Sequence, residues 1–190
     1  MGGNSDNLVD LPVREFLDRL ASATPQPGGG SCAALVGALA ASLGQMAVAF
    51  TTGREKFAQV ESEVQGVGQR LAQANQMLRR SIQEDSDAYA ALSKSFKMDK
   101  ADPKRAAAIE STASIAAGVP FQTAVLAKRV HAELERLKPI ANPNLRSDVE
   151  AAIFMARAAR EAAIANTRIN LPYMNEAAAK RIEDELAGLV

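Results

Sequence analysis

The chain has 190 residues, of which 47% are apolar and 23% are charged, so it can bury the core of one domain and is not disordered. Its 22 basic and 22 acidic side chains balance, which argues against a nucleic-acid-binding protein. One histidine and one cysteine exclude an internal disulfide and a multi-histidine or multi-cysteine metal site, and they favour a cytoplasmic location. The 38 alanines, against 12 valines and 8 isoleucines, predict helices and exclude an all-β fold.

The N-terminal segment, residues 1–10, lacks the basic start and apolar stretch of a secretory signal, and it is predicted to be a flexible leader. A single helical domain is expected over residues 11–190. Its first helix is predicted over residues 11–21. That helix ends at the loop of residues 24–30, because two prolines and three glycines cannot continue it.

An Ala/Gly-rich segment follows the loop, and Ser31 is expected to cap a helix that runs to Thr51. Residues 32–50 carry no charge, so the segment fits either a membrane span or a helix buried inside a bundle. We favour the buried helix and expect no membrane partner, because the segment is mostly Ala, Gly and Ser and no anchoring residues flank it closely. The small side chains on one face are those of Ala33, Gly37 and Ala41. Such a strip lets another helix approach closely, within the subunit or across a dimer.

A long helix is predicted over residues 57–96. Its apolar stripe consists of Leu71, Ala74, Leu78, Ile82, Tyr89, Leu92 and Phe96. The stripe position between Ile82 and Tyr89 is filled by Asp85. A carboxylate there is costly to bury unless it is paired, and burial raises its pKa, which suits a general acid/base. The alternatives are that Asp85 pairs with an arginine on a facing helix, or that the helix twists enough to expose it.

The rest of the chain also has a helical pattern. Asp102 and Pro103 form an expected helix start, and Gly118 and Pro120 are expected to kink or break that helix before it resumes to Leu137. Residues 147–150 read as a capping box for a helix to Asn170, and a final amphipathic helix reaches Leu189. The sequence thus predicts an all-α helical bundle with a buried Ala/Gly-rich central helix and one long helix.

Three polar features could bind a ligand. The Gly28, Gly29, Gly30 and Ser31 loop lies at a helix start, where free N–H groups attract anions, although a tight turn explains it equally well. Asn166 and Asn170 share a helix face, so their amides could bond each other, a facing backbone or a heterocyclic ligand. Asp148 fits a carboxylate stabilised by a helix N-terminus.

Four blocks in order resemble the formimidoyltetrahydrofolate cyclodeaminase/methenyltetrahydrofolate cyclohydrolase family over nearly the whole chain. The blocks are Thr24-Pro-Gln-Pro-Gly-Gly-Gly-Ser31, Thr51-x-Gly53-Arg54-x-Lys56-Phe57, Glu84-Asp85-x-x-Ala88-Tyr89, and Asn142-Pro-Asn144-x-x-Ser147-Asp148 followed by Asn166-x-x-Ile169-Asn170. Two positions depart from the family pattern. Ala141 replaces a usual glycine, which changes the shape of that loop, and Thr167 replaces a usual valine of similar size.

The resemblance implies an all-helical subunit that forms a homodimer and binds a folate derivative, with or without a polyglutamate tail, in a cleft near the subunit interface. It implies that Asp85 is the catalytic carboxylate and that no cofactor beyond the tetrahydrofolate substrate and no metal is needed. The residues that it implies in binding are Gly28, Gly29, Gly30, Ser31, Thr51, Arg54, Lys56, Asp148, Asn166 and Asn170, with Arg54 or Lys56 meeting the glutamate tail. Cyclodeaminase and cyclohydrolase activity both remain open, and a non-catalytic folate-binding or scaffold subunit is the alternative.

Overall fold

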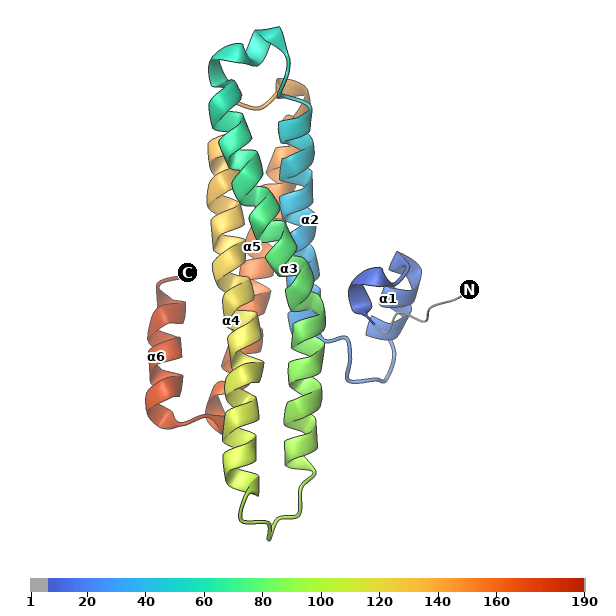
Figure 1. The fold of residues 1–190 in the computed structure, drawn as a ribbon, viewed down its shortest axis with the longest axis vertical. Helices are drawn as coiled ribbons and strands as arrows, with labels where there is room; N and C mark the ends of the chain where they lie inside the picture. The colour runs from blue at the N-terminus through green and yellow to red at the C-terminus, as the bar shows by residue number, and fades with distance from the viewer. Residues whose placement is uncertain (1–6, 190) are drawn as a thin grey trace.

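The computed structural model describes residues 7–189, and the core of this part of the chain is a four-helix bundle (Figure 1). The long helices are α2 (Gly29–Ala49), α3 (Glu61–Phe96), α4 (Arg105–Leu137) and α5 (Arg146–Arg168). They run alternately up and down, and α2 also contacts α4 across the bundle. Since no strand occurs among the described residues, the prediction of an all-α helical bundle is confirmed. The long helix that was predicted is α3, with 36 residues, and α4 is nearly as long, with 33.

Shorter elements connect and flank the bundle. The flanking helices are α1 (Val13–Leu20) and α6 (Glu176–Ala187), and the 3-10 turns are η1 (Leu8–Asp10), η2 (Glu55–Val60), η3 (Pro143–Leu145) and η4 (Leu171–Tyr173). Helix α1 stands to one side of the bundle, whereas α6 lies along α4 (Figure 1). Residues 1–6 of the expected leader lie outside the described residues. From Leu8 onward the leader is structured, because Leu8 is buried against Phe16, Ala34 and Ile82.

Helix α2 is the central helix because its small residues let neighbouring side chains approach its backbone. A Cβ at Gly37 would lie 3.1 Å from Leu78, and a Cβ at Gly44 would lie 2.6 Å from Leu134. By length and composition alone α2 could also cross a membrane. Its packing against α3, α4 and α5 accounts for the same composition, as in the core helix of a bundle.

The starts of several helices differ from the prediction. Helix α1 begins at Val13 rather than at residue 11, and α3 begins at Glu61 rather than at residue 57, because η2 occupies the residues before it. Helix α2 begins at Gly29, with Gly28 at the N-cap, so Ser31 lies inside the first turn and does not cap. Helix α4 begins at Arg105, because the Asp102 carboxylate accepts the N–H of Lys104 in a turn that precedes the helix. At the start of α4 a local hydrogen bond sets the boundary, and the spacing of apolar residues does not reveal such a bond.

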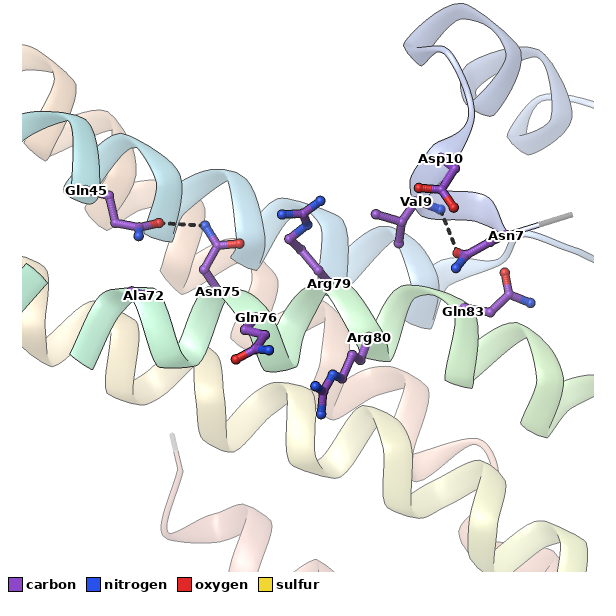
Figure 2. A pocket seen from close by; sticks show the side chains of 10 residues that line it. All are labelled: Asn7, Val9, Asp10, Gln45, Ala72, Asn75, Gln76, Arg79, Arg80 and Gln83. Carbon is purple, nitrogen blue, oxygen red and sulfur yellow. Dashed lines mark hydrogen bonds between the residues drawn. The ribbon is translucent and has the colours of Figure 1, made fainter. Parts of the chain in front are cut away.

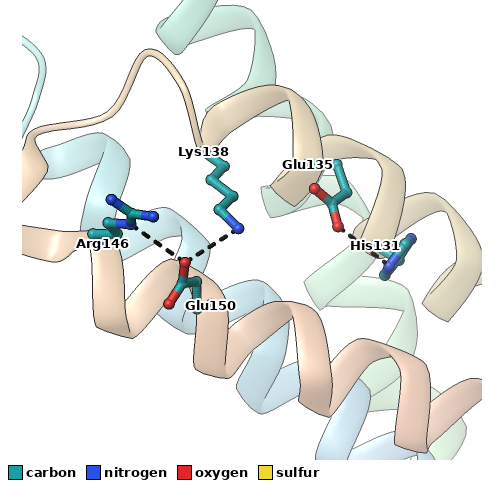
Figure 3. Close-up of polar contacts among 5 residues, drawn as sticks. All are labelled: His131, Glu135, Lys138, Arg146 and Glu150. Atoms are coloured by element: carbon teal, nitrogen blue, oxygen red, sulfur yellow. Dashed lines mark hydrogen bonds and ion pairs between the residues drawn. The ribbon is translucent and has the colours of Figure 1, made fainter.

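The predicted capping box of α5 does not form. The helix begins at Arg146, one residue before the expected cap, and Leu145 is its N-cap without a side-chain hydrogen bond. Glu150 instead contacts Lys138 at 3.2 Å and Arg146 at 3.3 Å (Figure 3). These hydrogen bonds hold the pKa of the Glu150 carboxyl below its ordinary value. Because the group is exposed, the contacts position the α4–α5 connection but contribute little stability.

Pro120 does not break α4, which runs as one helix from Arg105 to Leu137. Proline has no N–H, so it leaves the carbonyl of Ala116 without its helical donor. The Asn170 side chain donates its Nδ2 to that carbonyl at 3.0 Å. The predicted break at Pro120 is therefore wrong, and a side chain from the end of α5 replaces the missing hydrogen bond.

Candidate functional site

A cavity of about 320 Å³ lies at the N-terminal end of α2. It is bounded by the loop before α2, by α3 and α4, and by the end of α5 with η4. Its lining consists of Pro25, Gln26, Gly28, Gly29, Gly30, Asp85, Ser86, Tyr89, Leu92, Phe96, Ala116, Asn166, Ile169, Asn170 and Tyr173. Six of the predicted site residues are therefore brought together: the three glycines, Asp85 and the two asparagines.

Asp85 is the only acidic or basic side chain in this lining. It is half-buried, and its Oδ2 accepts the N–H of Ser31 at 2.7 Å and the hydroxyl of Ser31 at 3.0 Å. No ion pair to Asp85 occurs within residues 7–189, so the structure does not show the alternative of a facing arginine. Burial raises the pKa of the Asp85 carboxyl, and the two hydrogen bonds from Ser31 offset part of that shift.

Gly29 and Gly30 are required by space at this site. A Cβ at Gly30 would lie 2.0 Å from Asp85 Oδ1, and a Cβ at Gly29 would lie 2.7 Å from Asn166 Oδ1. Neither glycine has a positive φ, because Gly53 is the only glycine with one among the described residues. Their backbone conformation therefore does not require glycine. They are small so that the carboxylate and the amide can touch the start of α2.

Asn166 and Asn170 use their amide N–H groups on backbone carbonyls. Asn166 donates to Ala162 at 2.8 Å, and Asn170 donates to Ala116 and to the Asn166 carbonyl, both at 3.0 Å. Asn170 thus contacts a facing backbone on α4, whereas Asn166 bonds a carbonyl of its own helix. Their Oδ1 atoms accept no hydrogen bond from the described residues. Both asparagines thus offer the cavity a fixed acceptor.

Aromatic side chains form one wall of the cavity, and the sequence did not identify them as site residues. Tyr89 and Phe96 belong to the apolar stripe and were expected in the core, yet they remain partly exposed, at 43% and 37%. Tyr173 comes from η4 and contacts Phe96 edge to face, with ring centroids 4.9 Å apart. Their spacing from Asp85, four and eleven residues, could have placed Tyr89 and Phe96 on its face of the helix. No sequence signal pointed to Tyr173.

Ser31 and Gln26 hold parts of the site in place through hydrogen bonds to α3. Ser31 was predicted to touch substrate, but it is fully buried and donates to Asp85 instead. Gln26 donates its Nε2 to the backbone carbonyl of Ser86, which fixes the loop before α2 against α3. Gln26 belongs to the first block of the family resemblance, but it was not predicted as a site residue.

The other four predicted residues lie at the opposite end of α2. This helix has 21 residues and is therefore about 30 Å long. Thr51 is fully buried, which does not fit a substrate contact. Arg54 and Lys56 are exposed in the α2–α3 connection, where the Lys56 ammonium lies 4.7 Å from the Phe57 ring centroid. Asp148 lies in the first turn of α5, as expected for a carboxylate stabilised by a helix N-terminus.

A second cavity, of about 380 Å³, lies between η1, α2 and α3 (Figure 2). It contains Arg79 and Arg80 and a group of amides, among which Asn75 donates to Gln45 Oε1 at 2.8 Å. None of the predicted site residues lies in its lining. The cavity at the start of α2 is therefore the one that combines a half-buried carboxyl with the motif residues.

The fold and this cavity define a helical-bundle protein whose site centres on one half-buried carboxyl group. The sequence profile of the formiminotransferase-cyclodeaminase family matches residues 12–188, so the chain belongs to that family.

Individual relatives agree with this membership. The chain is 30% identical over 183 residues to a methenyltetrahydrofolate cyclohydrolase from Methylorubrum extorquens, covering 94% of this chain and 88% of the relative. It is 30% identical over 174 residues to the formimidoyltransferase-cyclodeaminase of Gallus gallus, but it spans only 32% of that protein. The crystal structure of formiminotetrahydrofolate cyclodeaminase from Thermotoga maritima superposes with a TM-score of 0.87 at 28% identity, covering 95% of this chain and 88% of that one.

Proposed function

We infer that this chain is an enzyme of tetrahydrofolate one-carbon chemistry, and we propose that Asp85 carries its proton transfers. Family membership and the names of the relatives support the substrate class. The observation that carries the catalytic role is the position of Asp85: a half-buried carboxyl with a raised pKa, without an ion pair among the described residues, in the wall of a cavity. A structural carboxylate would be paired or exposed.

Two reactions suit this site, and both need a single acid/base group. In a cyclodeaminase, N10 of 5-formimidoyltetrahydrofolate attacks the formimidoyl carbon and ammonia leaves, which closes the 5,10-methenyl bridge. In a cyclohydrolase, water adds to the methenyl carbon and the ring opens to 10-formyltetrahydrofolate. Either way the Asp85 carboxylate takes a proton from the nucleophile and returns it to the departing nitrogen. A raised pKa makes the protonated acid available nearer to neutral pH. No cofactor or metal is part of the proposed reaction.

The rest of the cavity suits a flat heterocycle. The Oδ1 atoms of Asn166 and Asn170 accept no hydrogen bond from the described residues, so they can accept from the N–H groups of a pterin. The rings of Tyr89 and Phe96 supply apolar surface for stacking on the opposite wall. These contacts would hold the ring while the bridge carbon faces Asp85.

We propose further that the subunit forms a homodimer through the outer face of α2. This helix carries no charged residue, and Leu39 and Phe50 on its exposed face are each 47% accessible. The neighbouring α1 exposes Val13 at 77%. A two-fold axis that pairs two copies of α2 antiparallel would bring the exposed Arg54 and Lys56 of one copy towards the cavity of the other, where they could meet a glutamate tail. Substituting Leu39→Glu should shift the mass in light scattering from dimer to monomer.

The experiment that tests the proposed function is a parallel assay of both substrates with wild type and Asp85→Asn. Loss of the methenyl absorbance reports hydrolysis, and ammonia release from the formimidoyl substrate reports deamination. We expect wild type to be active in at least one assay and the variant to be inactive. Tight folate binding without turnover in either assay would instead support a non-catalytic folate-binding subunit. The single cysteine suits the cytoplasm, where these substrates would be met.

A further inference from the structure

The two oxygens of Asp85 are not equivalent. Oδ2 accepts both hydrogen bonds from Ser31, at 2.7 Å and 3.0 Å, whereas Oδ1 accepts none from the described residues. Within residues 7–189, the buried side-chain atoms without a hydrogen-bond partner are Glu133 Oε2 and Arg160 Nε, and Asp85 Oδ1 is not one of them. It therefore keeps contact with solvent in the cavity. One carboxylate oxygen is fixed to the protein and the other is open.

From this asymmetry we propose that Ser31 is a positioning residue, which holds Oδ2 so that Oδ1 is the oxygen that exchanges protons with substrate. The proposal rests on the proposed function of Asp85. The Ser31 N–H can only donate, so a proton on Oδ2 would face another proton, and the neutral acid is protonated on Oδ1. During turnover, Oδ1 takes a proton from the attacking N–H or water and then gives a proton to the leaving nitrogen, which leaves the carboxylate as it began.

The start of α2 is built around this arrangement. Ser31 is in the first turn of the helix, where N–H groups lack helical partners, so the carboxylate of α3 serves as the cap that Gly28 cannot provide. Gly30 leaves the space that Oδ1 occupies, since a Cβ there would lie 2.0 Å away. The same residues that hold Oδ2 thus leave Oδ1 free.

The electrostatic surroundings of Asp85 make Ser31 the dominant neighbour. Within the cavity lining, α3 contributes the titratable side chain of Tyr89 and η4 contributes that of Tyr173. The loop and α2 contribute glycines and Gln26, α4 contributes Ala116, and α5 contributes amides and Ile169. Removing the Ser31 hydroxyl therefore changes the stabilisation of the carboxylate without disturbing another charge in the lining.

The test is Ser31→Ala, measured as the pH profile of kcat/KM and as a 13C-NMR titration of the Asp85 carboxyl in the substrate-free protein. Because one of two hydrogen bonds to the carboxylate is lost, both midpoints should move upward by about one pH unit. We expect kcat at neutral pH to fall by about tenfold with little change in KM. Ser31→Thr, which keeps a hydroxyl, should restore the profile.

The control is Ser81→Ala, which removes another buried hydroxyl of the bundle, one that donates to the Met77 carbonyl at 3.2 Å. It should leave both midpoints unchanged. Unchanged midpoints in a folded Ser31→Ala protein would overturn the proposal, and so would a higher KM with unchanged kcat, which would make Ser31 a substrate contact. Full activity of Asp85→Asn would instead overturn the proposed function itself. The NMR titration would then still show whether Ser31 holds the carboxylate, since it needs no turnover.

Discussion

The two ends of α2 carry similar residue types but differ in function: the start borders a cavity, and the end is held by hydrogen bonds within the protein. At its start, Asp85 and the Oδ1 atoms of two asparagines face a cavity with free acceptor sites. At its end, Thr51 donates to the Ala47 carbonyl at 2.7 Å and accepts the N–H of Asn142 at 2.9 Å. Asn142 in turn donates to the Phe50 carbonyl and accepts from Asn144. Motif residues whose polar atoms lack a hydrogen-bond partner in the protein indicate a binding site. Motif residues whose polar atoms are all hydrogen-bonded within the protein indicate a structural role.

Asp85→Asn is the most direct test of the start of α2, where the cavity lies. It preserves size and can still accept from Ser31, but it removes the titrating group. The rate should fall by about 10² to 10⁴, while the melting temperature is unchanged or higher because a desolvated carboxylate is replaced by a neutral amide. Glu84→Gln, at the exposed neighbouring carboxylate, is the matched control and should keep full activity. A destabilised but active Asp85→Asn protein would contradict the assignment.

Gly30→Ala tests whether the start of α2 depends on close approach. The added Cβ would meet Oδ1 at 2.0 Å, so the Asp85 side chain has to move. A displacement of about 1 Å at a reacting group costs about 10² in rate, which we expect in kcat, with the helical circular-dichroism signal preserved. Gly118→Ala is the control, because nothing lies within 4 Å of its Cβ and an alanine should even favour α4. Equal activity of both variants would show that activity does not depend on the close approach of Asp85 to Gly30.

Thr51→Val tests the end of α2, where the polar atoms are hydrogen-bonded within the protein. Losing the hydroxyl leaves the buried N–H of Asn142 without its acceptor, which should lower the free energy of unfolding by about 1–3 kcal/mol. Chemical denaturation measures this loss, and kcat should stay at the wild-type value. Thr52→Val, which removes a half-buried hydroxyl bonded only to the Val48 carbonyl, should cost less. A large loss of kcat in stable Thr51→Val would contradict a purely structural role for Thr51.

The stability of the two ends should also respond differently to pH. Burial raises the pKa of Asp85 in the folded state, so its protonated form stabilises the fold. That contribution is complete below the unfolded pKa of about 4 and is lost as pH rises through the folded pKa. The unfolding free energy of wild type, relative to Asp85→Asn, should therefore fall over this window. The difference between wild type and Thr51→Val should stay constant there, and a rising wild-type curve would mean that Asp85 is stabilised as a carboxylate.

Much of the fold could be predicted because long helices repeat their apolar residues in a regular pattern. The missing stripe position at Asp85 was visible for the same reason. The continuity through Pro120 and the contact between Ser31 and Asp85 could not be predicted, because each depends on a partner far away in the chain. The start of α4 could not be predicted because a local turn at Asp102 sets it, not the apolar pattern. The aromatic wall was missed because an apolar residue beside a cavity has the same spacing as one in the core. Tyr173 enters the site from a loop whose path only the folded chain defines.

The contact between Asn170 and the carbonyl that Pro120 leaves free has an evolutionary consequence. The amide is needed at that carbonyl only while position 120 lacks an N–H, so these two positions are expected to constrain each other as sequences diverge. A double-mutant cycle measures the constraint. Asn170→Ala should destabilise the chain with Pro120 more than it destabilises Pro120→Ala, in which a helical N–H supplies the bond. In relatives that have lost the proline, Asn170 would no longer be needed at the Ala116 carbonyl. Substitutions at position 170 would then be limited only by the ligand.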